Sequence, residues 1–417
     1  MSFRFAKFRL AFQSVAKLWN AFFFAPQSAT PLALYRIIYG LLITADLVLL
    51  HGDWLTWFGP NGLVSLETLR SLSPNAKPNL IWAPLQYDIC IQGFFWIFLL
   101  FAVFLTFGFL SRLSSMMVFI CLGAIIQRNG YITNGSDYLL RFTGFFLMLA
   151  PSGAAISVDR LLRIWRGQES IEAQPCWPWA QRMIQIQTAM LYVSAFCWKT
   201  VGSDWRDGTA LYYTTRLLQF QRFPMPTLEN GLALRLATWS SLFIEFAMGV
   251  LVWVRKLRYW ILLSGVCLHL SIEYSMNVPL FEWVAMAGYV TFIDPGDLSR
   301  MWAWVRRRFD GGFGQPVDVI YDGCADRSLH SANVLRAIDI FGRLNFIDRH
   351  SAEGRAGWPD LSNSQGKMLF VSRASAEEGF SGLVAISPLV PLLWWLAPVS
   401  VLSGRWKHAL PALKAAK

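Results

Sequence analysis

Apolar residues form eight runs that match, or come close to, the length of a membrane-spanning helix. Such a helix needs about 20 mostly apolar residues, although packed bundles accommodate shorter ones. The runs cover residues 32–50, 93–111, 114–127, 138–157, 183–199, 232–254, 259–276 and 278–294. They predict a polytopic α-helical membrane bundle of about eight helices over residues 26–295.

The first 25 residues carry a different pattern, in which large apolar side chains recur at helical spacing among basic ones. A basic amphipathic helix of this kind lies in the membrane surface. The segment lacks the order of basic end, apolar centre and small-residue exit that marks a cleavable signal peptide. We therefore expect residues 1–25 to form an interfacial helix, with basic side chains at Arg4, Lys7, Arg9 and Lys17.

Beyond Pro295 the pattern changes again. Residues 296–315, with three consecutive arginines and then several glycines, predict a linker. Within 316–417, strands at 317–321 and 368–372 flank a helix at 328–343, which predicts a small α/β domain. The segment 383–402 is apolar enough to span a membrane, and its prolines equally suit a helical hairpin or a packed end of the domain.

Composition and charge support the membrane assignment. Of 417 residues, 55% are apolar and 15% charged, against about 25% charged in soluble domains. The net charge of +11 comes from short basic clusters between the apolar runs, not from one basic stripe, so we expect membrane lipids as partners and no nucleic acid. With eight spans, every cluster falls on the side of the N-terminus. The N-terminus and the C-terminal domain are therefore expected in the cytoplasm.

Charged side chains interrupt the apolar runs at Arg36, Asp46, Arg141 and Glu245. Ionisable residues within membrane helices are costly and usually face the bundle interior or a polar cavity. Together these four predict a polar interior site. His269, in the seventh run, is interpreted either as part of that site or as a structural histidine.

Two further polar residues lie at helix ends. Asp137, in the turn 134–137, is the expected N-cap of the fourth helix, and capping alone explains it. Lys199 ends the fifth run and is followed by Asp204 and Trp205. It is either an interfacial anchor beside aromatic residues or a base, because desolvation favours the neutral amine.

The order of these residues resembles the HTTM family, a bacterial membrane domain similar to vitamin K-dependent gamma-carboxylase, over roughly residues 25–295. The positions that carry the resemblance are Arg36, Asp46, Asn134–Asp137, Ser157–Asp159, Trp198, Lys199, Asp204, Trp205, Gly208, Glu245, His269 and Phe281. The resemblance implies a multi-pass protein of the bacterial inner membrane. Its ligand cavity would include Arg36, Asp46, Asn134, Asp137, Arg141, Asp204, Trp205 and Glu245.

In the carboxylase, the lysine before the Asp-Trp motif deprotonates reduced vitamin K. By resemblance that role falls on Lys199, with His269 as the second catalytic residue. Ser136 or a neighbour stands where the carboxylase carries a further histidine, and the predicted topology has no large extracytoplasmic domain. The resemblance thus implies a reduced quinone or another lipid-soluble ligand, and not glutamate carboxylation of a protein.

The C-terminal segment Val319–Gly323 resembles the DCC family of thioredoxin-like proteins, in which two cysteines follow the Asp-Gly pair. Without a gap, Ala325 and Ser328 take the cysteine positions; shifted by one residue, Cys324 and Arg327 do. Neither alignment leaves a pair of cysteines, so we expect no disulfide exchange. The remaining alternative is a redox role for the single thiol of Cys324. The six cysteines show no metal-ligand spacing.

Three functions follow from these observations. The first is a carboxylase-like or quinol-dependent membrane enzyme. The second is a non-catalytic membrane receptor or scaffold whose redox-inactive cytoplasmic domain binds a protein partner. The third is a transporter, which a polar interior also suits, although no internal repeat is evident.

Overall fold

The computed structural model describes residues 2–65, 67–68, 71, 87–309, 316–352, 354, 368–371 and 376–402. The chain divides into two compact units. The first contains Met1–Ser157 and Gln174–Ile293, and the second contains Val158–Ala173 and Asp294–Lys417.

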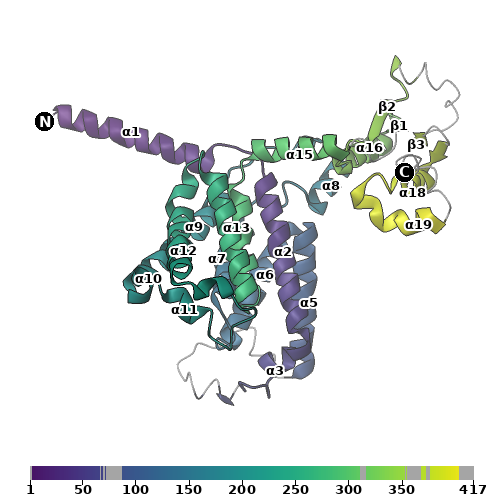
Figure 1. The fold of residues 1–417 in the computed structure, drawn as a ribbon. Helices are drawn as coiled ribbons and strands as arrows, with labels where there is room; N and C mark the ends of the chain where they lie inside the picture. Colours follow the sequence, from purple (N-terminus) through teal and green to yellow (C-terminus); the bar gives the residue numbers. More distant parts are fainter. Residues whose placement is uncertain are drawn as a thin grey trace. The chain divides into compact units, whose positions relative to one another are not determined.

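The first unit is helical in its described residues, and long helices such as α2 and α5 run side by side (Figure 1). Its helices are α1 (Ser2–Phe24), α2 (Thr30–Leu50), α3 (Trp54–Phe58), α5 (Asp88–Phe107), α6 (Ser111–Arg128), α7 (Gly135–Leu149), α9 (Trp179–Val201), α10 (Ser203–Asp207), α11 (Ala210–Thr214), α12 (Gly231–Val250), α13 (Arg258–Ser275) and α14 (Phe281–Ala287). A short 3₁₀ helix, η4 (Gly288–Phe292), follows α14. Buried apolar side chains from α2, α5, α6 and α7 form the largest hydrophobic core.

Helices overlap all eight predicted apolar runs. Within the described part of the chain, however, only three helical stretches are both long and apolar enough to cross a membrane. They are Thr30–Phe58, Asp88–Phe107 and Gly231–Trp253. The membrane-protein assignment is therefore supported, whereas the count of eight spans stays a prediction.

Two helix boundaries differ from the prediction. The fourth run was expected to be helical to residue 157, but α7 ends at Leu149, where Pro151 and Gly153 oppose continuation of the helix. The last run, 278–294, forms the short α14 and then η4. Its helix begins after Leu280, whose φ of 56° is left-handed.

The helices approach closely where a glycine faces a neighbour. At Gly40 in α2, a Cβ atom would lie 2.5 Å from the Oγ1 atom of Thr106 in α5. Small residues at such contacts let membrane helices pack by van der Waals attraction, because lipid supplies no hydrophobic force between them.

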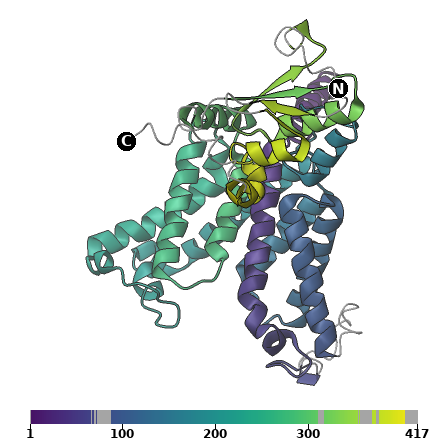
Figure 2. The same cartoon turned by 90° about the vertical axis from the view of Figure 1, so that its right-hand side faces the viewer.

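The second unit combines a sheet with helices (Figure 2). Its strands are β1 (Val317–Tyr321), β2 (Leu344–Asp348), β3 (Leu369–Val371) and β4 (Ala376–Glu378), and its helices are α8 (Val158–Trp165), α15 (Pro295–Phe309), α16 (Asp326–Ile338), α18 (Gly379–Ile386) and α19 (Ala397–Leu402). The strand order is β2-β1-β3-β4. β1 pairs with β2 in parallel and with β3 in antiparallel orientation, and β3 pairs with β4 in antiparallel orientation.

The strand predicted at 317–321 is confirmed, and so is the core of the one at 368–372. The helix predicted to residue 343 ends at Ile338, because Asp339 accepts hydrogen bonds from the backbone N–H groups of Arg343 and Leu344 and turns the chain into β2. The segment 296–315, expected to be a linker, is helical up to Phe309 as part of α15, and its glycines lie outside the described residues. The linker assignment stays a prediction. The thioredoxin-like classification stays a prediction.

Candidate functional site

The candidate site of the first unit is built from six neighbouring elements, α9, α10, α12, α13, α14 and η4, each of which packs on at least one other. α9 contributes Tyr192 and Lys199, whose seven-residue spacing places them on one face of the helix. α12 contributes Glu245, and α13 contributes His269. The site therefore draws on helices that are distant in the sequence.

Lys199 and Glu245 form an ion pair between the Nζ and Oε1 atoms. The Lys199 ammonium also lies 4.6 Å from the centre of the Trp205 ring, a distance at which an aromatic face attracts a cation. Glu245 is 6% exposed, and its Oε2 atom has no hydrogen-bond partner among the described residues. A buried carboxylate oxygen without a donor is costly, so it marks a position where a ligand donor would be favoured.

His269 lies at the centre of a second buried group. Its Nδ1 atom pairs with the Oε2 atom of Glu282, and its Nε2 atom lies 2.6 Å from the Tyr192 hydroxyl oxygen. That hydroxyl lies 2.6 Å from the hydroxyl of Tyr289. If the Nδ1–H group donates to Glu282, then Nε2 accepts from Tyr192, which in turn accepts from Tyr289. A carboxylate that fixes the histidine tautomer in this way prepares Nε2 to exchange a proton.

The two groups are electrostatically linked. Glu245 interacts electrostatically with His269 and with Tyr192. Gly265, one turn before His269, permits the close approach of η4, because a Cβ atom there would lie 2.7 Å from the Tyr289 hydroxyl. The structure thus brings Lys199, Trp205, Glu245 and His269 into one region; their catalytic and binding roles stay predictions.

The remaining predicted cavity residues occupy other places. The Arg36 guanidinium is fully buried and donates to the carbonyl oxygens of Ser152 (2.8 Å) and Ile156 (2.6 Å). Arg141 is half-buried beside Gly123 of α6, and Asp204 is exposed. Their placement in a ligand cavity stays a prediction.

The turn before α7 is a capping box. Asn134 is the N-cap, and its side chain accepts a hydrogen bond from the Ser136 N–H (2.7 Å), while Asp137 accepts one from the Asn134 N–H (2.8 Å). The expectation that Asp137 is the N-cap is therefore wrong, since Asp137 occupies the third helical position. Asp46 of α2 interacts electrostatically with Asp137, and the binding roles of both residues stay predictions.

Sequence reasoning missed Tyr192 and Tyr289 as members of the site. Tyrosines are common in membrane helices, and only their partners in the packed bundle distinguish these two. The spacing of Tyr192 to Lys199 is the one signal that the sequence offered. From the sequence, Glu282 could be recognised only as a charged residue within the last apolar run.

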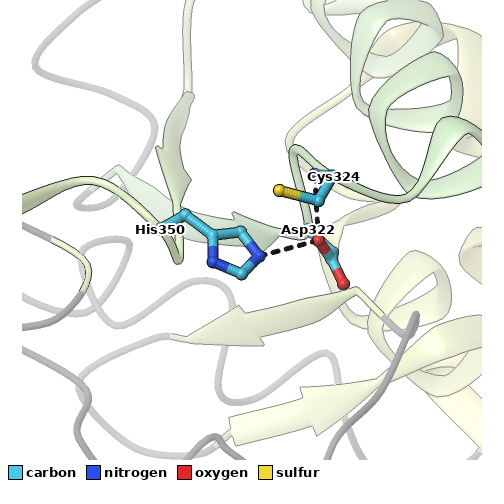
Figure 3. Close-up of side chains that lie close together, drawn as sticks. All are labelled: Asp322, Cys324 and His350. Atoms are coloured by element: carbon cyan, nitrogen blue, oxygen red, sulfur yellow. Dashed lines mark hydrogen bonds and ion pairs between the residues drawn. The ribbon is translucent and has the colours of Figure 1, made fainter.

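The second unit contains Cys324, for which the sequence left a single-thiol redox role as an alternative. All six cysteines are free, and Cys324 lies beside Asp322 and His350 (Figure 3). Burial opposes ionisation of Asp322, but hydrogen bonds from His350 and from the Cys324 N–H, with the charge of Arg349, hold the pKa of this carboxyl below its usual range. Ser328, at one candidate position for a second cysteine, is buried, and its Oγ atom accepts a hydrogen bond from the Asp322 N–H (2.9 Å).

Comparisons with known proteins bear on the first unit above all. The uncharacterized protein YitO of Bacillus subtilis (strain 168) is 23% identical over 133 residues, which are 30% of this chain and 42% of that protein. The match thus spans less than half the length of this relative. No solved structure matches the chain. The HTTM domain matches residues 24–296, which is more than half of the 417 residues, and the chain therefore belongs to the HTTM family.

Proposed function

We propose that this HTTM protein is a membrane enzyme that removes a proton from a lipid-soluble substrate of the reduced-quinone class, with Lys199 as the base. Membership of the HTTM family supports a membrane protein related to the gamma-carboxylase family. The observation that carries the proposal is the Lys199–Glu245 pair, whose carboxylate has one buried oxygen to which no described residue donates.

The pair has a chemistry suited to proton removal. Lys199 accepts a proton only as the neutral amine, and Glu245 can take the proton that the ammonium gives up. Transfer within the pair converts two charges into two neutral groups, which the burial of Glu245 favours. When Lys199 then takes the proton of a substrate hydroxyl, the O–H bond breaks, an N–H bond forms, and the new ammonium lies beside the substrate anion.

The residues of the site fit a reduced quinone. The Oε2 atom of Glu245, which has no donor in the described part of the chain, can accept a hydrogen bond from a phenolic hydroxyl. Trp205 offers an aromatic face next to Lys199. A bound reduced quinone would supply an acidic hydroxyl and reducing electrons. His269, oriented by Glu282 and connected to Tyr192, would hold or pass a second proton.

The proposed cellular placement is the bacterial inner membrane, with the N-terminus and the second unit in the cytoplasm. The family and the apolar helices support a membrane location. The basic clusters support the orientation, since Arg255, Lys256 and Arg258 lie between the predicted sixth and seventh spans. Lys199 would then lie near the outer face.

The proposed activity is tested by replacing the base. We expect the full-length protein in lipid nanodiscs to consume a short-chain naphthoquinol in the presence of dissolved oxygen, followed by ultraviolet absorbance. Lys199→Ala should lower the rate by roughly 100-fold or more, the usual contribution of a positioned base. Glu245→Gln should retain the amine but change the pH dependence of the rate, because the proton partner is lost.

The matched control is Lys256→Ala, which removes an exposed lysine outside the site and should leave the rate unchanged. A folded Lys199→Ala protein that retains the wild-type rate would overturn the role of Lys199. A folded wild-type protein that consumes no quinol would overturn the reduced-quinone class.

A second candidate function is a membrane receptor or scaffold, with the second unit as a thioredoxin-like domain that binds a protein partner. The observation in its favour is Ser328, which occupies a candidate cysteine position and uses its hydroxyl to hold the backbone of Asp322. A specific cytoplasmic partner that co-purifies with both the wild type and Cys324→Ser would support this function. Recovery of no partner from solubilised membranes would count against it.

A further inference from the structure

Three side chains with metal-binding atoms meet at one edge of the sheet in the second unit. Asp322 directly follows β1, and His350 lies two residues after β2. The strands are parallel, with Tyr321 opposite Asp348, so their carboxyl ends share an edge, where ligands of α/β folds often bind. Cys324 lies in the turn between β1 and α16, at the same edge.

The three side chains are already close to the spacing of a metal site. Their ligand atoms all lie within 4.8 Å of one another, and the Oδ1 atom of Asp322 lies 3.0 Å from the Nε2 atom of His350. Ligands of a tetrahedral zinc ion lie roughly 3.3 to 3.7 Å apart, given bonds of about 2.0 to 2.3 Å. Figure 3 shows the thiol and the imidazole beside the carboxylate, so small side-chain rotations would complete the arrangement.

The contacts of His350 themselves point to a cation. The Nε2 atom lies 3.0 Å from a carboxylate oxygen of Asp322 and 3.1 Å from the Nε–H donor of Arg349. If Nε2 accepts from Arg349, its lone pair and the Asp322 oxygen are two acceptors facing each other. If Nε2 carries a proton, that proton opposes the Arg349 donor. A metal ion bound to both atoms would satisfy the Nε2 lone pair and the Asp322 oxygen together, with the Arg349 Nε–H group turned away from Nε2.

A supporting set of contacts holds the ligands in place. The Oδ1 atom of Asp348 accepts hydrogen bonds from the backbone N–H groups of Gly323 (3.2 Å) and His350 (3.0 Å), which ties the two loops together. Gly323 is required there, because a Cβ atom would lie 2.3 Å from Asp348. Arg349 pairs with the Oδ2 atom of Asp322 at 2.7 Å, so the carboxylate is oriented with Oδ1 toward His350. Such outer contacts commonly position metal ligands.

We infer that Asp322, Cys324 and His350 form a binding site for a thiophilic divalent transition metal of the zinc class, with at least one coordination position open to water or a ligand. The combination of thiolate, imidazole and carboxylate suits Zn²⁺ and its spectroscopic substitute Co²⁺, and not Mg²⁺ or Ca²⁺, which prefer oxygen alone. Cys324 and His350 are exposed, which leaves the site accessible. This site is independent of Lys199 and of the proposed proton removal.

Cobalt binding to the full-length protein tests the inference. The purified protein, with its affinity tag removed, is treated with a chelator in detergent and titrated with Co²⁺. We expect one Co²⁺ per chain with a thiolate-to-cobalt charge-transfer band in the near ultraviolet, displaced by one equivalent of Zn²⁺. Cys324→Ser should abolish the band, and His350→Gln and Asp322→Asn should each weaken Co²⁺ binding at least about tenfold.

Matched controls separate this site from adventitious binding. Cys267→Ser removes another exposed cysteine, and His330→Gln removes another histidine of the second unit; both should bind Co²⁺ as the wild type does. The inference is overturned if the folded wild type gives no charge-transfer band, or if Cys324→Ser keeps it. X-ray absorption of the zinc-loaded protein should show one sulfur ligand, and a shell of oxygen and nitrogen alone would equally overturn the inference.

Discussion

The Tyr192 hydroxyl serves two partners in the interior of the helical unit. It lies within hydrogen-bond distance of both His269 and Tyr289, and all three side chains are buried. A hydroxyl can donate one hydrogen bond and accept another, so both contacts are satisfied together. Tyr192 is therefore the residue on which the hydrogen-bonded chain from Tyr289 to Glu282 depends.

Comparison of two phenylalanine variants tests this arrangement. Tyr192→Phe removes the partner that the described residues provide for His269 Nε2 and for the Tyr289 hydroxyl, whereas Tyr289→Phe leaves the Tyr192–His269 bond in place. Each unsatisfied buried group costs about 1–3 kcal/mol, so Tyr192→Phe should lower the apparent melting temperature in detergent more than Tyr289→Phe does. Equal or reversed shifts in tryptophan fluorescence melts would contradict the proposed chain.

At the residue scale, the sequence predicted the charged members of this region but not its hydroxyl groups. Lys199, Glu245 and His269 stand out because an ionisable group in an apolar run needs a partner. Which partner it finds depends on helix packing, and Glu282 is thirteen residues from His269 in the chain. Tyr192 carries no such signal, since a tyrosine in a membrane helix is unremarkable by itself.

At the element scale, Arg36 connects three segments of the first unit. From α2 it donates to two carbonyl oxygens in the segment that follows α7, and it lies against Gly108 at the end of α5. The fourth apolar run was expected to continue as helix through this segment. Its apolar composition does continue, but Pro151 and Gly153 end the helix, and a buried guanidinium satisfies carbonyl groups that the helix no longer pairs.

Removal of this connection should destabilise the first unit. Arg36→Met deletes two short hydrogen bonds from a charged donor, each worth roughly 1.5–3 kcal/mol, and should markedly lower the apparent melting temperature in detergent. The control Arg112→Met removes an exposed arginine of α6 and should change it little. A similar small effect for both variants would show that Arg36 does not hold the segment after α7.

At the scale of the whole molecule, composition and basic clusters were enough to predict a membrane protein with a distinct C-terminal domain. The strand at 317–321 could be predicted because a short run of β-branched residues between turn residues is distinctive. β2 was missed, since Leu344–Asp348 is a short run interrupted by Asn345 and ending in a charged residue, and its partner β1 is more than twenty residues away. The number of spans could not be predicted with certainty from the sequence, because several helices are short or carry charges. Such helices lie near the minimum length and hydropathy that a membrane-spanning helix needs.

Labelling of single cysteines can fix that number. If the chain has eight spans, five of these spans lie between residues 13 and 207, and all eight lie between residues 13 and 345. If only the three long and apolar stretches cross the membrane, two spans lie between residues 13 and 207, and three lie between residues 13 and 345. The three substitutions are made one at a time in a variant without native cysteines, at positions that are all exposed. If there are eight spans, a membrane-impermeant maleimide should label Gln13→Cys and Asn345→Cys from the cytoplasmic side. It should label Asp207→Cys from the opposite side. Labelling of Gln13→Cys and Asp207→Cys from one side, with Asn345→Cys on the other, would instead establish three spans, and detergent-solubilised protein should react at every position as the control.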